Sequence, residues 1–543
     1  MRILTASRLA GLFFVLFASA SSAAVRVDEA IDVSSFPSAV EALNVGEELE
    51  SARRWGDAIR FYEAALERWE DSSDLSYALR RTRVHFGIER RYTDTSFDEQ
   101  LLRQGRSELL DLLEEVLVRV QLEYITRVSA TRFVAHGTES FYMALSNPRF
   151  AARHLEPGDS AAIDRVKGTL IRDFWNRRIG SRLEARMVVT EVCELATREL
   201  GLRSSAVVLE FIFGGCNALD DYSDFLTADR YNDLNGSIQG EFVGIGIEMV
   251  ALHGLGMQLM RVLPDSPAEK GGLRPGDCIV SINGSNCRDM TTDEAAQLLR
   301  GIKGSRVTLG FEDPDGRYQE GGFRRESVEI KSITHAMILD EDHGIGYIRQ
   351  SVFQSTTAQE LDRALAKLED SGMKSLIWDL RDNPGGLLET AAAVIDRFID
   401  EGVLVSTEGR FVDQNQTFRA RSWDTRRYPL VLLVDEDSAS ASEIVAGAIQ
   451  DHGRGTIVGR TTFGKWSVQT IIHLPGGNGL KLTTAKFYSP EHENYSGKGL
   501  EPHVVVNDHA TYFRGRTSDE IRLDPDVARA LEVLESRSAR NGY

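Results

Sequence analysis

A serine and a lysine in the last quarter of the chain, Ser440 and Lys465, are the side chains best suited by type to covalent chemistry. A serine hydroxyl is a weak nucleophile until a base removes its proton, and a neutral lysine amine can be that base. A Pro-Gly-Gly turn at 384–386 adds backbone N–H groups, which can stabilise a developing negative charge. Together these elements could support nucleophilic attack on an acyl carbon.

The segments around these residues predict an α/β sheet that brings them to one edge. Apolar runs at 375–381, 429–434 and 457–459 are typical of buried strands, and helical patterns follow the first two. The glycine turn follows the first strand, Ser440 the second and Lys465 the third. Open α/β sheets place their active sites at the carboxyl ends of their strands. We therefore expect the three elements to meet there, with Ser440 at a helix N-terminus.

A lysine can act as a base at neutral pH only if its pKa lies well below the ordinary value. Lys465 is flanked by apolar residues, and loss of water would lower its pKa. The chain has only ten lysines among 63 basic residues, and arginine could not release a proton. This support is weak, because four of the ten lysines fall between residues 465 and 498. The ordinary alternative is a helix-capping serine and a surface lysine.

Two other hydrolytic chemistries find less support in the residues. His452 follows Asp451 and His473 lies nearby in sequence, so serine–histidine catalysis is an alternative. However, no G-x-S-x-G segment surrounds any serine. No H-E-x-x-H or paired-cysteine motif occurs either, so we expect no metal and no cofactor.

Between residues 237 and 327 the pattern changes to short β-rich runs and glycine turns. A glycine-rich segment, formed by Gly244, Ile245, Gly246 and Ile247, precedes a Pro-Gly-Asp turn, an Asn-Gly turn and a short helix at 293–300. This order resembles a PDZ domain. The resemblance implies that backbone N–H groups of the glycine-rich segment bind the C-terminal carboxylate of a peptide, which adds as a strand. A structural β domain without a ligand is the alternative.

The rear of the chain resembles the C-terminal processing peptidases, also called tail-specific proteases. The resemblance covers roughly residues 195–540. The matching segments are 219–226 (LDDYSDFL), 380–386 (LRDNPGG), 438–444 (SASASEI), 450–454 (QDHGR), 463–465 (FGK) with Gln469, and 497–502 (GKGLEP).

The resemblance implies roles for single residues. Ser440 would be the nucleophile, Lys465 the general base and Gln469 the residue that orients the lysine, with Asp451 in a supporting place. The amide of Ala441, with that of Gly385 or Gly386, would hold the oxyanion. The family usually has glycine after the lysine, where this chain has Trp466. The indole could shield the amine, narrow the cleft or mark a protein without activity.

The front half of the chain predicts helices and shows no site chemistry. Residues 39–70 read as two helices broken near Trp55 and resemble a tetratricopeptide hairpin, with packing residues Gly46, Leu49, Ala58, Tyr62 and Ala65. One such unit cannot bury its own face, so we expect a hairpin docked on the rest rather than a peptide-binding array. Further helical spacing runs through 99–155 and 161–202. A partner or adaptor protein at this helical front remains an open possibility.

The first residues predict export. Arg2 and Arg8, an apolar run at 9–17 and small residues at 18–24 form a secretory signal pattern, with a membrane anchor as the alternative. We expect a periplasmic or extracellular protein with no integral span after the signal is removed. The net charge of −19 argues against a nucleic-acid partner. The four cysteines favour buried free thiols, although a Cys278–Cys287 link stays open.

These observations combine into a multidomain α+β protein with a helical N-terminal region, a PDZ-like β domain and an α/β serine-peptidase core. The expected divisions are a signal peptide (1–24), a tetratricopeptide-like region (25–95), a helical region leading into the peptidase fold (96–236), the PDZ-like domain (237–327), the peptidase core (328–512) and a C-terminal helical segment (513–543). The predicted function is an exported serine endopeptidase that recognises the C-terminal region of protein substrates through its PDZ-like domain and cleaves them with a Ser–Lys dyad. The alternative is a non-catalytic binding or scaffold protein.

Overall fold

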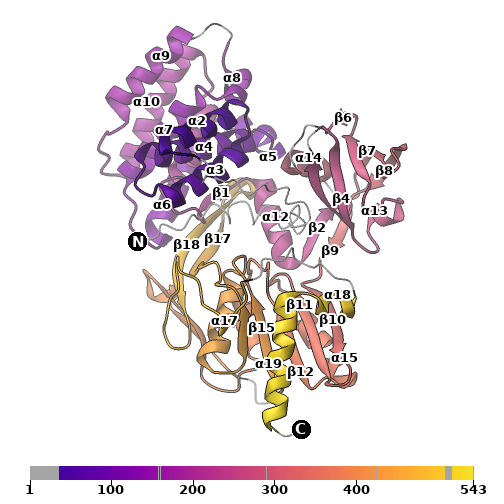
Figure 1. The fold of residues 1–543 in the computed structure, drawn as a ribbon. Coiled ribbons are helices and arrows are strands. Elements are labelled where there is room, and N and C mark those ends of the chain that lie inside the picture. The colour runs from indigo at the N-terminus through magenta and orange to yellow at the C-terminus, as the bar shows by residue number, and fades with distance from the viewer. Residues whose placement is uncertain are drawn as a thin grey trace.

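The computed structural model describes residue 33 and residues 36–541, except 157, 159, 253, 289, 291, 302, 422–424 and 508–516. The expected signal peptide at 1–24 lies outside the described residues. Among the described helices, none has the length and apolar character needed to cross a membrane. Figure 1 shows a helical region, a small β-rich domain beside it and an α/β region below, with helix α12 (Ala228–Gln239) between them.

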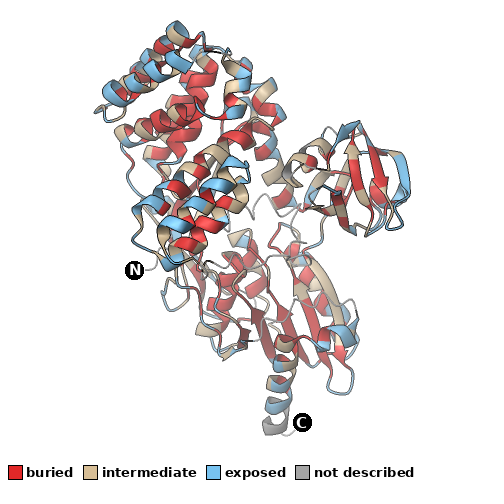
Figure 2. Ribbon diagram, turned by 45° about the horizontal axis from the view of Figure 1, so that its top comes forward, coloured by how far each residue is buried: buried red, intermediate tan, exposed pale blue. Residues whose placement is uncertain are grey.

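The helical region forms because apolar residues recur at helical spacing and become buried. A large core runs from α4 to α11, and α2 and α3 form a smaller cluster with the start of α4; buried residues are red in Figure 2. Many of its helices begin at a serine, aspartate or asparagine whose side chain accepts a backbone N–H. The helices are α2 (Ala39–Ser51), α3 (Trp55–Arg68), α4 (Ser73–Arg91), α5 (Thr95–Glu99), α6 (Arg106–Glu123), α7 (Ala130–Ala144), α8 (Pro148–His154), α9 (Ser160–Thr169), α10 (Arg182–Leu200) and α11 (Ser204–Cys216).

The first two helices form the expected hairpin, and its small residues explain the close contact. A Cβ atom on Gly46 would lie 2.1 Å from the Tyr62 ring, so this position has no room for a side chain. Ala58 and Ala65 are fully buried in the same cluster, to which α4 adds Leu75. The hairpin is therefore docked on a third helix, as one isolated unit requires.

The β-rich domain is a sheet in the order β3-β4-β5-β7-β8, with β6 paired to β5. Its first strand, β3, is an edge strand that lies near helix α14. A separate two-stranded ribbon of β2 and β9 joins the domain to the rest of the chain (Figure 1). The elements are β2 (Glu241–Gly244), β3 (Ile247–Leu252), β4 (Gly256–Val262), α13 (Pro267–Lys270), β5 (Cys278–Ile282), β6 (Ser285–Asn286), α14 (Thr292–Leu299), β7 (Arg306–Glu312), β8 (Tyr318–Arg324) and β9 (Glu326–Glu329).

The α/β region is built on a sheet in the order β10-β11-β12-β15-β16-β19, in which all pairs after β10–β11 are parallel. Side chains alternate between two cores: Leu376 and Trp378 face α15, α16 and α17, whereas Ile377 faces α18 and α19. The elements are β10 (Ile333–Asp340), β11 (Ile345–Gln350), α15 (Thr357–Asp370), β12 (Ser375–Asp379), α16 (Leu388–Ile395), β15 (Leu430–Val434), α17 (Ala441–Asp451), β16 (Thr456–Gly459), β19 (Val504–Val505), α18 (Ser518–Arg522) and α19 (Pro525–Asn541).

A second sheet, not foreseen in the sequence, ties the α/β region to the helical region. It joins β1 (Asp224–Leu226), β13 (Val403–Gly409), β14 (Gln416–Arg419), β17 (Ser467–His473) and β18 (Gly479–Tyr488). Leu474, Leu480 and Leu482 from the β17–β18 hairpin are fully buried in the helical core. The multidomain α+β prediction is confirmed, and the regions share packed surfaces.

The four cysteines carry free thiols, so Cys278 and Cys287 are not bridged in this structure. Cys193, Cys216 and Cys287 are buried, as expected, whereas Cys278 is half-exposed.

Candidate active site

Three neighbouring parallel strands end beside one another and deliver the residues singled out in the sequence. Strand β12 leads into the glycine turn, β15 leads to Ser440, and β16 leads to Lys465. Because β12 pairs with β15 and β15 pairs with β16, their carboxyl ends share one edge of the sheet. The predicted positions of these strands and turns are confirmed.

Ser440 occupies a strained turn directly before helix α17. Its backbone φ is +54°, a value that non-glycine residues rarely adopt. Such a conformation costs on the order of 1–3 kcal/mol and persists only where the surroundings enforce it. Ser440 is half-buried, whereas residues 441–449, which follow it in the helix, are buried. The turn therefore presents this side chain at the surface of an otherwise closed core.

The glycine turn packs directly against Ser440. A Cβ on Gly385 would lie 2.8 Å from the Ser440 Cβ and 2.7 Å from the Ala441 nitrogen, and one on Gly386 would lie 2.1 Å from the Phe353 oxygen. The Gly385 N–H donates to Asn383 Oδ1 over 2.9 Å. Among the described residues, no acceptor is found for the N–H of Gly386 or of Ala441. These two amides are therefore available beside the serine.

A buried carboxylate, Glu443, holds the serine turn and the lysine segment together. Its Oε2 accepts the backbone N–H of Ser440 over 2.9 Å and that of Lys465 over 2.8 Å. Its Oε1 accepts from Thr462, Gly464 and the Trp466 indole. The pKa of Glu443 is raised overall, because burial outweighs the opposing effect of these hydrogen bonds. Five donors converge on two oxygens, an environment that fits an ionised carboxylate.

Lys465 is almost completely withdrawn from water, with 2% of its surface exposed. Burial lowers its pKa from 10.5 to about 7, and the nearby charge of Lys481 adds to this effect. The carboxylates of Asp220 and Glu443 act in the opposite direction. The Lys465 Nζ lies 4.7 Å from the centroid of the Tyr222 ring. A large fraction of this amine is therefore uncharged near neutral pH.

The structure places the two other predicted residues differently. Gln469 lies on β17, and its side-chain amide donates to Ser467 and to Thr483. Asp451 ends helix α17, roughly 16 Å along the axis from Ser440. There it accepts the backbone N–H of Glu491 over 2.9 Å. Asp451 is thus not brought to the serine.

Trp466 lies in the core behind the site and not in the cleft. It is 1% exposed, its indole N–H donates to Glu443, and its ring packs on Phe487 and Tyr495. The bulky residue after the lysine therefore supports the carboxylate that links the two segments.

A buried ion network fixes the strand that leads to the glycine turn. Arg381 is 3% exposed and donates to Asp379 over 2.7 and 3.0 Å. It also donates to Asp524 and Asp526, at the start of α19. Arg381 thereby anchors the C-terminal helix to the strand below the site. Removal of one partner would leave an uncompensated buried charge, which is strongly destabilising.

The glycine-rich segment of the β domain forms the turn that leads into β3. The carbonyl oxygens of Ile245 and Gly246 accept N–H groups of Ala268 and Leu263 inside the domain. In a trans peptide the N–H points away from the C=O, so the N–H groups of Gly246 and Ile247 face the other side. Gly246 has φ +84°, and a Cβ there would lie 2.3 Å from the Ser266 Cβ. The segment therefore requires glycine at this position.

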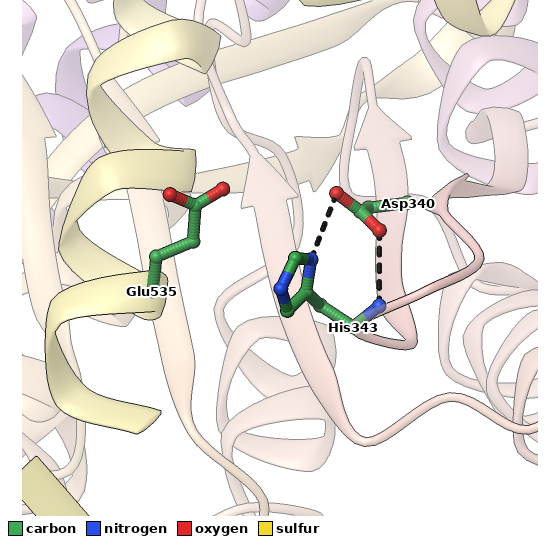
Figure 3. Close-up of side chains that lie close together, drawn as sticks. All are labelled: Asp340, His343 and Glu535. Carbon is green, nitrogen blue, oxygen red and sulfur yellow. Dashed lines mark hydrogen bonds and ion pairs between the residues drawn. The ribbon is translucent and has the colours of Figure 1, made fainter. Parts of the chain in front are cut away.

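Another group of polar side chains lies at the opposite edge of the α/β sheet. Asp340, His343 and Glu535 offer ligand atoms within 4.8 Å of one another (Figure 3). Asp340 already accepts from the His343 backbone and from Arg522 over 2.8 Å. The guanidinium thus meets the only buried carboxylate of the group, which ties α18 to the β10–β11 turn.

Comparisons with known proteins match two parts of this chain. Residues 344–506 match the model of peptidase family S41, and residues 259–313 match a PDZ domain model. The carboxy-terminal-processing protease of Bartonella bacilliformis is 38% identical over 299 residues, which cover 53% of this chain and 67% of the relative. The carboxyl-terminal-processing protease of Synechocystis is 35% identical over 323 residues, 58% of this chain and 74% of the relative.

A photosystem II D1 C-terminal processing protease of known structure is 24% identical with a TM-score of 0.39, and the match covers 74% of this chain and 93% of that one. The family-model match and the two sequence relatives establish the family of this chain. The chain belongs to peptidase family S41, carries a PDZ domain and is a serine-type peptidase.

Proposed function

We propose that this protein is an exported endopeptidase of the C-terminal processing type, which cleaves peptide bonds with a dyad of Ser440 and Lys465. The main support is the buried amine of Lys465, whose pKa is lowered to about 7. In addition, the backbone N–H groups of Lys465 and Ser440 donate to the same oxygen of Glu443. A lysine at its ordinary pKa would be almost wholly protonated at neutral pH and could not act as a base.

In the proposed reaction the neutral Lys465 amine takes the proton of Ser440, and the serine oxygen attacks the carbonyl carbon of the substrate. The N–H groups of Ala441 and Gly386 hold the oxyanion of the tetrahedral intermediate. The Lys465 ammonium then gives its proton to the leaving amine, and an acyl-enzyme remains. Lys465 next accepts a proton from water, which attacks the ester carbonyl. The bond to the Ser440 oxygen then breaks, Lys465 returns the proton to that oxygen, and the second product leaves.

We assign Asp451 no contact with the reacting groups. For Gln469 we propose an indirect effect on Lys465, through strand β17. Gln469 donates to Ser467 and Thr483, two residues of the strands that follow Lys465. We therefore propose that Gln469 fixes the start of β17 and so the direction in which the lysine leaves the backbone. Asp451, at the far end of α17, ties that helix end to residue 491.

The PDZ domain supplies the proposed substrate selection. The outward N–H groups of Gly246 and Ile247 would bind the terminal carboxylate, and the free edge of β3 would pair with the peptide backbone. Proteins with exposed, apolar C-termini are the proposed substrates. Export rests on the signal pattern at 1–24, and N-terminal sequencing of the mature protein should then begin near residue 25.

Cleavage of an unfolded carrier protein ending in Ala-Leu-Ala tests the catalytic part. The Ser440→Ala variant should lose at least about 10⁴-fold of the rate, while Ser496→Ala, a change at an exposed serine, should keep it. Equal product from Ser440→Ala and the unchanged protein would exclude serine catalysis. Absence of product from both proteins would instead favour the alternative of a non-catalytic binding protein.

Peptide binding tests the PDZ part separately. A peptide ending in a free Ala-Leu-Ala should bind at least about tenfold more tightly than the same peptide with an amidated C-terminus, since amidation removes the charge that the N–H groups would hold. Equal affinities would contradict carboxylate recognition and leave the dyad untouched.

A further inference from the structure

Tyr222 covers the amine of Lys465. The Nζ atom lies 4.7 Å from the centroid of the tyrosine ring, within the range in which an ammonium is attracted to an aromatic face. Tyr222 belongs to the segment 219–226, which matched the peptidase resemblance without being given a role. Its ring is half-buried, whereas the lysine beneath it is 2% exposed. The ring therefore packs on the buried amine and itself reaches the surface of the protein.

The loop that carries Tyr222 is fixed from several sides. Asp220 Oδ1 accepts the Tyr222 N–H over 3.2 Å and the Ser223 hydroxyl over 2.7 Å. Tyr124 in the helical region accepts the Asp220 N–H over 2.9 Å, and Ser223 accepts the Thr483 N–H over 3.0 Å. The loop is thus held both to the helical region and to β18. These hydrogen bonds therefore fix the position of the Tyr222 loop relative to β18.

Opposing charges face the amine from the other elements. Lys481 lies on β18, Glu443 on α17 and Asp220 on the same loop as Tyr222. The two carboxylates favour the ammonium, whereas Lys481 and burial favour the neutral amine. The tyrosine ring favours both forms of the amine. Its bulk excludes water, which favours the neutral amine, and its face attracts a cation, which favours the ammonium.

We propose that Tyr222 is a positioning residue for the dyad, which excludes water from the neutral Lys465 amine and stabilises the ammonium formed when Ser440 loses its proton. This inference rests on the proposed function and adds to it a residue outside the peptidase core. Because a base must be neutral before the reaction and charged during it, one group that serves both states is useful to catalysis.

Covalent labelling of Ser440 by phenylmethanesulfonyl fluoride measures the dyad without a peptide substrate. The serine oxygen forms a bond to sulfur, fluoride leaves, and Lys465 takes the proton. The labelling rate of the full chain should rise with pH between pH 5 and pH 10. The midpoint of this rise, which we call the limb of the pH–rate profile, should lie near pH 7. Three variants then separate the two actions of the ring.

Tyr222→Phe keeps both the bulk and the aromatic face and should leave the limb unchanged. Tyr222→Leu keeps most of the bulk but loses the face, so the limb should move to lower pH and the plateau rate should fall about tenfold. Tyr222→Ala admits water, so the pKa of Lys465 should rise and the limb should move to higher pH. Shifts of opposite sign are a result that loss of stability alone would not produce.

Tyr495→Leu is the matched control, because Tyr495 packs on Trp466, next to Lys465 in the chain, and is likewise half-buried. It should lower the melting temperature without moving the limb. Limbs that stay in place in Tyr222→Leu and Tyr222→Ala, or that move in the same direction, would overturn the inference. If Lys465→Met reacts as fast as the unchanged protein, the dyad itself fails, whatever the Tyr222 variants do.

Discussion

The peptidase turn and the PDZ segment both depend on glycine, yet they are connected to the molecule in opposite ways. Gly385 and Gly386 lie in a core where an added Cβ would meet backbone atoms within 3 Å, and buried groups fix the surrounding turns. The PDZ domain is joined through the β2–β9 ribbon and through ion pairs such as Arg300–Asp233 and Arg149–Glu294, whose side chains are partly exposed. Buried contacts thus fix the peptidase turn, whereas partly exposed contacts attach the PDZ domain.

The largest effect should come from the amine that the peptidase region buries. Lys465→Arg keeps a positive charge but cannot lose its proton, so labelling and cleavage should fall by at least about 10³-fold. The exposed change Lys498→Arg is the control and should be silent. An active Lys465→Arg protein would show that this region does not use the lysine as its base.

A second variant tests whether Glu443 fixes the site. Glu443→Gln places an amide donor among five donors, so the free energy of unfolding should fall by about 2–3 kcal/mol. The cleavage rate should also fall, by roughly 10- to 100-fold, because Ser440 and Lys465 lose their common acceptor. Chemical denaturation and rate measurements check both results against the exposed variant Glu389→Gln. Unchanged stability would contradict the assigned role.

Stability should depend on pH through Lys465. The unfolded amine keeps its proton up to pH 10.5, whereas the folded amine releases it near pH 7. The unfolded state therefore binds more protons between these values, and this group makes stability rise with pH across that window. Lys465→Met removes the buried charge and should raise the free energy of unfolding at pH 6 by more than about 1 kcal/mol while activity is lost. Denaturation of both proteins at pH 6 and pH 9 measures the difference, and a less stable Lys465→Met protein at pH 6 would contradict it.

The smallest effect should come from a change in the contacts that attach the PDZ domain. Arg300→Ala removes a partly exposed ion pair between α12 and the PDZ domain, so stability should fall by less than about 1 kcal/mol. Cleavage of tailed substrates should change by about two- to threefold, while labelling of Ser440 should stay the same. A large loss of labelling would mean that the PDZ attachment is part of the rigid site.

The sequence predicted the strand ends of the active site because buried strands read as continuous apolar runs and their order along the chain places them side by side. It did not reveal the function of Glu443, whose five donors include groups about twenty residues away. A signal was present, since Ser440 and Glu443 form the S-x-x-E pattern of a capping box. The pairing of β1 with β18 joins residues 224–226 to 479–481, a separation that no local pattern encodes.

The β2–β9 ribbon has a practical consequence for protein engineering. Glu241 and Glu329 lie opposite one another in the register, so the points where the chain leaves for the PDZ domain and returns from it are neighbours. Opposite residues of an antiparallel pair have Cα atoms about 5 Å apart, a gap that a two-residue hairpin can close. The PDZ domain could therefore be replaced by another peptide-binding domain, or deleted, without cutting any strand of the peptidase region.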